Sequence, residues 1–154
     1  MKPVFWKLSM GGTDFKHIFE VLEWLRQGLV LVHKDTKSQG IKRDSQGKLF
    51  VASDRIGDYF YLCNGNKGPS VILLGQFTGP ANPLSSKGDG WAEREFRWIK
   101  TSILANKYEG EDKWWSPKHN STFTVVPEKE LGMFESSILY PYFGVKLADF
   151  RIEV

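Results

Sequence analysis

The sequence predicts an α+β domain: a small β-barrel of five or six strands with flanking helices. Short apolar and aromatic stretches of strand length recur along most of the chain. Helical spacing is confined to one segment near the N-terminus and one near the C-terminus. The 154 residues suffice for one domain with a sizeable core, and no repeat period is visible. We therefore expect a single domain.

The first part of the chain predicts a strand, a helix and a second strand. Residues 4–9, VFWKLS, have the composition of a strand. Residues 11–28 show helical spacing, with Thr13 or Asp14 as the N-cap and a glycine at the C-terminal end. Residues 29–32, LVLV, are too apolar for a strand exposed on both faces. The apolar residues expected on the inner face of the helix are Phe15, Ile18, Phe19, Leu22 and Leu25.

A long loop separates this part from the remaining strands. Residues 33–47 lack periodicity, and a loop of this length in a compact domain is often functional. The dipeptide Asn64-Gly65 indicates a hairpin turn. The expected strands are KLFVA (48–52), DYFYLC (58–63), SVILLGQFTG (70–79), EREFRWIKT (93–101) and STFTVVP (121–127).

The last expected elements are an alternating strand and a closing helix. In residues 93–101, Glu93, Glu95 and Arg97 share one face, and Arg94, Phe96 and Trp98 share the other. Pro127 suits the first turn of a helix that points Leu131, Phe134 and Ile138 inward. Barrel and closing helix would occupy about residues 1–140. Residues 141–154 would dock on the barrel or begin a linker.

Composition excludes several classes of protein. Hydrophobic content of 41% and charged content of 25% exclude a disordered or fibrous chain, and aromatic content of 14% is high. No apolar run is long enough to span a membrane, and the N-terminus lacks the apolar core of a signal peptide. We therefore expect a cytoplasmic protein without a membrane partner. The single cysteine, Cys63, lies in a strand-like stretch and is expected to be buried.

Motifs for enzyme chemistry are missing. The chain has no P-loop, no G-x-S-x-G elbow, and no metal-binding context around His17, His33 or His119. Carboxylates such as Asp54 and Asp58 lie in charged surroundings and are expected to face solvent. We therefore predict a binding module without a metal or cofactor.

Aromatic residues separate into two groups. Six lie on expected strands, where core packing explains them: Phe5, Trp6, Phe60, Tyr61, Phe77 and Trp98. Trp91, Trp114 and Trp115 instead stand among glycine, lysine, serine and proline in loops. A large aromatic surface in a loop is typical of a contact with a partner.

The order of these motifs resembles a known family. VFWKLS, GLVLV, IGDYFYLCNGNKG, VILLGQFTGP and, after a tryptophan-bearing loop, EFRWI follow one another between residues 4 and 126. This succession resembles the EVE and YTH domains of the PUA-like superfamily. It is also similar to the N-terminal DNA-recognition modules of McrB-type, GTP-dependent restriction proteins, which act on modified DNA.

The resemblance implies a barrel whose mouth accepts one base flipped out of its strand. Ser9 and Met10 would read the base edge from the end of the first strand, and Trp91 would form one wall of an aromatic cage. His33 lies near the place where the relatives have a tryptophan. Candidates for the missing wall are Tyr59, Trp114 and Trp115. The base would be a cytosine derivative or a methyladenine.

Two basic stretches indicate phosphate contacts, although a solvated loop explains the first as well, and a loop packed against the barrel explains the second equally well. Net charge is +3, and the excess lies between residues 34 and 48. The predicted phosphate-binding residues are Lys34, Lys37, Lys42, Arg43, Lys113, Lys118 and His119. The leading hypothesis is a domain that reads a modified base in DNA for a restriction system, fused to a GTPase motor beyond residue 154. The alternatives are an RNA-binding PUA-like module and a protein-interaction domain that uses exposed tryptophans.

Overall fold

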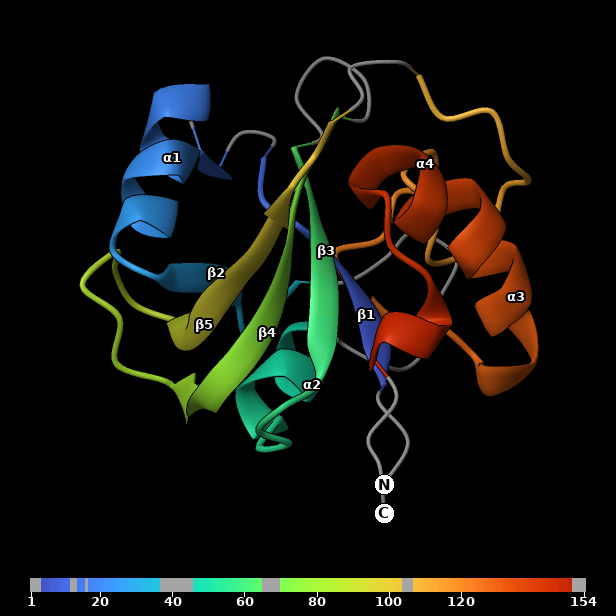
Figure 1. The fold of residues 1–154 in the computed structure, drawn as a ribbon. Coiled ribbons are helices and arrows are strands. Elements are labelled where there is room, and N and C mark those ends of the chain that lie inside the picture. Colours follow the sequence, from blue (N-terminus) through green and yellow to red (C-terminus); the bar gives the residue numbers. More distant parts are fainter. Residues whose placement is uncertain are drawn as a thin grey trace.

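The structure is a computed structural model that describes residues 4–11, 14–15, 17–36, 46–64, 70–103 and 107–150. A six-stranded sheet lies between helix α1 on one side and helices α3 and α4 on the other (Figure 1). The strands are β1 (Phe5–Ser9), β2 (Leu29–His33), β3 (Tyr59–Asn64), β4 (Ser70–Asn82), β5 (Trp91–Thr101) and β6 (Phe123–Val125). The helices are α1 (Ile18–Arg26), α2 (Gln46–Ala52), α3 (Leu131–Phe134) and α4 (Tyr140–Phe143), with the shorter or irregular turns η2 (Glu128–Glu130), η3 (Glu135–Leu139) and η4 (Leu147–Phe150).

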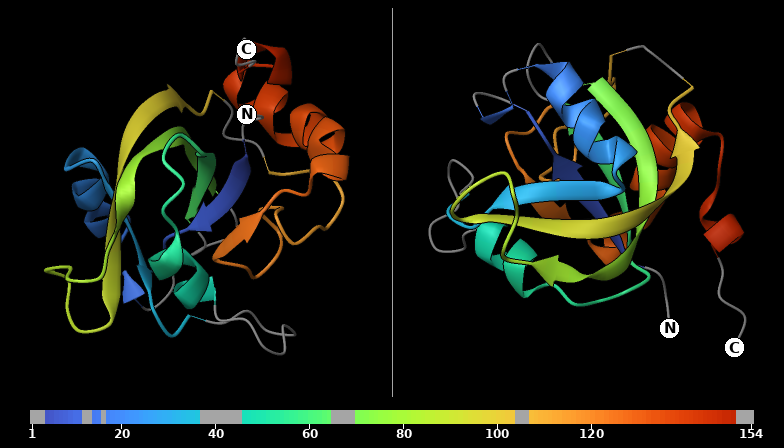
Figure 2. Two further views of the ribbon diagram at one scale, coloured as in Figure 1. Left: turned by 90° about the horizontal axis from the view of Figure 1, so that it is seen from below. Right: turned by 90° about the vertical axis from the view of Figure 1, so that its left-hand side faces the viewer.

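The predicted α+β class is confirmed, and the sheet has six strands where five or six were expected. The strand order is β2-β5-β4-β3-β1-β6, and β1 runs parallel to β3 while the other neighbouring pairs are antiparallel. The long strands β4 and β5 curve strongly (Figure 2). In the described residues β2 and β6 are the two edges of this sheet. The barrel expected from the sequence would require these two strands to pair, and in the described residues they do not, so the sheet is curved but open.

Side chains of the sheet form two hydrophobic cores. Trp6, Leu8 and Phe60 belong to the first core, which also takes residues from α1 and α2. Phe5 and Tyr61, which alternate with them along β1 and β3, belong to the second core, beneath the C-terminal helices. Both faces of the central strands are thus covered, which explains why these strands contain so few polar residues.

Helix α1 differs from the expectation in its start and its inner face. It is capped by His17, whose Nδ1 accepts a hydrogen bond from the Phe19 amide at 3.3 Å, and not by Thr13 or Asp14. Val21 and Leu25 are buried, whereas Phe19 is 70% exposed and Leu22 also faces solvent. Leu25 is thus confirmed as an inner residue and Ile18 packs against the first core, but the stripe passes through Val21 and not through Phe19 and Leu22.

The expected strand at residues 48–52 is wrong, because this stretch lies within α2. It is too short for helical and strand patterns to differ clearly. Phe50 is buried in the first core. The Gln46 side chain fixes the helix to the sheet, since its Oε1 accepts hydrogen bonds from the amides of Thr122 at 2.6 Å and Phe123 at 2.7 Å.

The hairpin of β3 and β4 is confirmed, although its turn, residues 65–69, lies outside the described residues. Two side chains were placed wrongly. Trp98 is 43% exposed, since the buried side of β5 ends at Phe96. Asp58 is buried, and its carboxylate is satisfied there by two hydrogen bonds. It accepts one from Trp6 Nε1 at 3.0 Å and one from Arg55 Nε at 3.1 Å.

The closing helix is confirmed in outline. Pro127 precedes η2, and Phe134 and Ile138 are buried. Phe150 in η4 packs on the rings of Phe5, at 5.3 Å, and Tyr59, at 4.7 Å between centroids. The segment up to residue 150 therefore docks on the sheet and is not a linker.

Candidate nucleic-acid interface

The loop between β4 and β5 is a series of hydrogen-bonded turns. Asn82 Oδ1 accepts a hydrogen bond from the Leu84 amide at 3.0 Å, and Ser85 Oγ accepts one from the Lys87 amide at 3.2 Å. The Trp91 amide donates to the Gly88 carbonyl at 3.2 Å. The loop borders an open hollow of about 370 Å³, whose lining ends at Gly90, the residue before Trp91. Its lining residues are Pro83, Leu84, Ser85, Ser86, Gly88, Asp89 and Gly90.

Trp91 lies at the first position of β5, opposite His33 at the end of β2, and is partly buried. Two rings meet it nearly edge-on, that of His33 at 5.2 Å and 85° and that of Phe15 at 5.4 Å and 75°. Gly90 makes the approach of His33 possible. It has φ +83°, and a Cβ at this position would lie 2.5 Å from His33 Nε2.

Lys87 fills the corner between Phe15 and Trp91. Its Nζ lies 4.4 Å from the centroid of the Phe15 ring and 4.8 Å from that of the Trp91 ring. The same Nζ donates to Glu20 Oε2 at 2.7 Å and to the Asp14 carbonyl at 2.8 Å. In Figure 2 the loop after β4 reaches the same end of the molecule as the residues before α1. Sequence reasoning missed Phe15, Glu20 and Lys87 as site residues.

The structure separates the residues predicted for one pocket. His33 and Trp91 meet, as described above, but Met10 is fully buried in the first core. Tyr59 belongs to the other side of the sheet, where its ring stacks on Phe5 at 5.4 Å. Ser9 ends β1, and its amide donates to the Thr122 carbonyl at 2.8 Å, on the side of β6.

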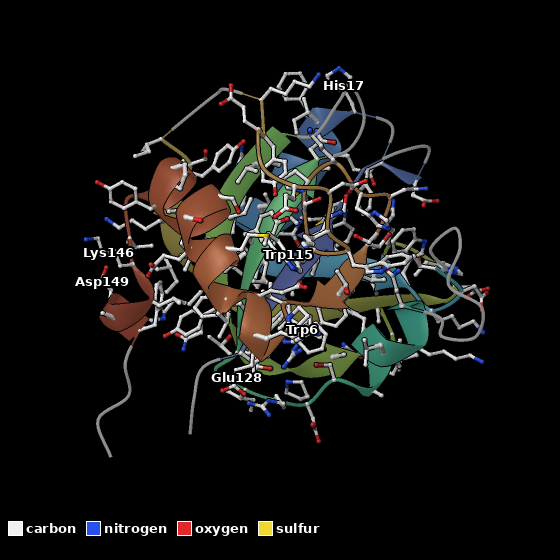
Figure 3. All side chains as sticks on the ribbon, turned by 90° about the vertical axis from the view of Figure 1, so that its right-hand side faces the viewer. Trp6, His17, Trp115, Glu128, Lys146 and Asp149 are labelled. Atoms are coloured by element: carbon white, nitrogen blue, oxygen red, sulfur yellow. The ribbon has the colours of Figure 1, made fainter. Side chains whose placement is uncertain are left out.

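Trp114 and Trp115 are neighbours in the chain with different environments. Trp115 is only 1% exposed, and its Nε1 donates to Glu130 Oε1 at 2.7 Å. Figure 3 places it near the centre of the molecule, among the second core. Trp114 is 43% exposed, and its ring meets that of His119 at 4.1 Å. Of the two, only Trp114 offers a surface to a partner.

A buried lysine holds the Trp114 loop against the sheet. Lys7 Nζ donates to the His119 carbonyl at 2.7 Å and to Ser121 Oγ at 2.8 Å. Ser121 in turn donates to the Trp114 carbonyl. Burial lowers the pKa of Lys7 from 10.5 to about 8. The position of Trp114 therefore depends on a side chain of β1.

The predicted phosphate-binding residues differ in the exposure of their side chains and in their contacts with carboxylates. Lys34 and Lys118 are exposed, whereas Lys113 Nζ lies 3.7 Å from a carboxylate oxygen of Glu130. His119 Nδ1 lies 3.3 Å from Asp112 Oδ1. Lys37, Lys42 and Arg43 lie outside the described residues.

Other kinds of site find little support. Among the described residues no group of three or more His, Cys, Asp or Glu side chains could hold a metal ion. The Cys63 thiol is buried as predicted, and burial raises its pKa to about 11. In the same part of the chain, no helix combines the length and apolarity that crossing a bilayer requires.

Comparison with known proteins returns structural similarities only. No protein-family model and no curated protein match the chain. A Pseudomonas syringae protein matches with a TM-score of 0.41 and 13% identity over 66% of this chain and 71% of its own. A hypothetical protein from Leishmania major matches with a TM-score of 0.44 and 12% identity over 69% of this chain and 71% of its own.

A third similar structure is human THYN1, solved in complex with 5-methylcytosine containing DNA. It matches with a TM-score of 0.39 and 11% identity, over 86% of this chain and 75% of its own. At TM-scores below 0.5 these similarities establish no function. The function of this chain has to be inferred from its own residues.

Proposed function

We propose that this domain binds DNA and holds one modified base, flipped out of its strand, against the indole of Trp91. The observation that carries the proposal is the setting of this ring. The ring is partly exposed, it follows directly after the last residue that lines an open hollow, and its orientation is fixed by His33 and Phe15. A fixed indole gives a stacking surface for a base, worth about 1 to 3 kcal/mol.

Charge and a second tryptophan support a nucleic-acid partner. Net charge is +3, and the exposed Lys34 immediately follows His33. Trp114 is exposed in a loop that also carries the exposed Lys118. An aromatic ring next to basic side chains suits a nucleotide strand, because the ring stacks on a base while the ammonium groups neutralise phosphates.

Affinity for duplexes that differ only in base methylation tests this proposal. Labelled duplexes are titrated with the domain at several salt concentrations, and anisotropy is measured. We expect tighter binding to one methylated duplex and weaker binding at higher salt, since phosphate contacts release counterions. Equal affinity for all duplexes would contradict the recognition of a modified base.

Substitution of Trp91 identifies the ring that stacks. Trp91→Ala should weaken binding to the preferred duplex by more than about tenfold. Trp98→Ala is the matched control, because Trp98 lies on the same strand and is 43% exposed. If both variants weaken binding equally, Trp91 has no special role.

Two further parts of the proposal need their own tests. Binding to RNA of the same sequence distinguishes an RNA-binding module, since the 2′-hydroxyl is the group by which proteins tell RNA from DNA.

The role in a restriction protein, which the sequence resemblance implies, predicts that cells expressing the full-length protein exclude methylated plasmids and accept unmethylated ones. Equal transformation by both plasmids would remove that role and leave base recognition standing.

A further inference from the structure

The corner beside Trp91 already holds a cation. Around Lys87 Nζ stand two aromatic rings, a carboxylate oxygen of Glu20 and the backbone carbonyl of Asp14, at the distances given above. Aromatic faces carry partial negative charge, so they attract an ammonium group, and a carboxylate and a carbonyl strengthen this attraction. The four groups together make a site for positive charge.

This site coincides with the surface that the proposed function needs. The Lys87 ammonium lies over the Trp91 ring, and its side chain is only 11% exposed. A base that stacks on this face must therefore displace the ammonium. Lys87 lies in the loop between β4 and β5, whose residues are mostly exposed, so its side chain can turn outward into solvent when the ammonium is displaced.

We propose that the base held at Trp91 is positively charged, namely a nucleobase alkylated on a ring nitrogen. The inference rests on the proposed function and specifies its ligand. The charged ring takes the place of the Lys87 ammonium over the Trp91 ring, with Glu20 as the counterion.

The charge balance of the site favours a cationic base over a neutral one. When a neutral base displaces Lys87, Glu20 and the Asp14 carbonyl lose their ammonium donor and gain no positive charge. When a cationic base displaces it, one cation replaces another, and the carboxylate, 33% exposed, keeps an opposite charge beside it. The cationic base also stacks on Trp91 as a neutral base would, and the ring attracts its charge.

Isomeric pairs of modified bases test this inference. Single-stranded oligonucleotides are prepared with one N1-methyladenine or one N6-methyladenine, and with one N3-methylcytosine or one 5-methylcytosine. The two members of each pair are isomers, and only the member methylated on a ring nitrogen is a cation. Single strands are used because methylation at N1 of adenine or N3 of cytosine also weakens base pairing, and a weakened pair is easier to flip in a duplex.

We expect the cationic member of at least one pair to bind about tenfold more tightly than its neutral isomer. Glu20→Gln, which keeps the shape of the side chain and removes its charge, should abolish most of this preference. Glu23→Gln is the matched control on the same helix, because Glu23 is exposed and pairs with Arg26. Lys87→Met should raise the affinity for both members, since it removes the internal competitor.

Three outcomes overturn the inference. They are equal affinity within both pairs, tighter binding of the neutral member, and equal effects of Glu20→Gln and Glu23→Gln. If neutral methylated bases bind in a manner that depends on Trp91, the proposed function stands and only the charge of the base is wrong. If no oligonucleotide binds in that manner, both proposals fail.

Discussion

Gly90→Ala should destabilise the domain through the contact between Gly90 and His33. The residue has φ +83°, and a Cβ would lie 2.5 Å from His33 Nε2. A left-handed conformation costs an L-residue about 1 to 2 kcal/mol, and forcing the imidazole off its rotamer costs about 1 kcal/mol more. We expect a loss of about 2 to 3 kcal/mol in the free energy of unfolding, and a fall in Tm of about 5 to 10 °C.

Thermal unfolding followed by circular dichroism measures this loss. Gly132→Ala is the control, because a Cβ there has no neighbour within 4 Å, and it should leave Tm unchanged or raise it slightly. In Gly90→Ala with His33→Ala the clash disappears, so the double variant should be more stable than the sum of the two single losses predicts, by about 1 kcal/mol. The reasoning is refuted if Gly90→Ala unfolds like Gly132→Ala, or if the two losses simply add.

Three further predictions concern buried polar groups. The pKa of Lys7 is about 8 in the folded protein and 10.5 in the unfolded chain, so the unfolded chain binds the proton more tightly. Below pH 8 Lys7 is charged in both states, and the folded state bears the full cost of burying this charge. Stability relative to Lys7→Met should therefore rise between pH 8 and pH 10.5 by up to about 3 kcal/mol, and a constant difference in urea titrations would contradict this. Cys63 should react with a thiol reagent at pH 8 only after unfolding, and rapid labelling of the native protein would show that it is accessible. Arg94→Lys removes hydrogen bonds to Gly79, Ser53 and Arg55 and should cost about 3 kcal/mol in urea unfolding, where a loss below about 1 kcal/mol would count against a structural role.

Strands were predictable from the sequence because their signals are local. Apolar runs bounded by glycine, proline or asparagine located β1, β2, β3, β4, β5 and β6. The inner face of α1 was predicted only in part, at Ile18 and Leu25, since Phe15 is buried but precedes the helix. Including it shifted the expected stripe onto Phe19 and Leu22, which face solvent.

The features that could not be predicted from the sequence depend on contacts between residues far apart in the chain. Trp114 and Trp115 have nearly the same neighbours in the chain, and contacts with distant residues distinguish them, such as the packing of Trp115 against Phe134 at 5.5 Å between centroids. Lys87 meets Glu20 across 67 positions. A lone lysine in a glycine-rich loop indicates nothing about such a partner, so this part of the site required the structure.

Side chains of β1 and β3 point alternately into the two cores, and this affects how the domain unfolds. Each strand contributes one set of side chains to the layer around α1 and the intervening set to the layer beneath α3 and α4. If either layer unfolds, apolar side chains of β1 and β3 become exposed to water. The same two strands support the other layer, so that layer is destabilised as well. The two halves should therefore unfold cooperatively, and damage beside Phe134 should lower the melting temperature that a probe beside Trp91 reports.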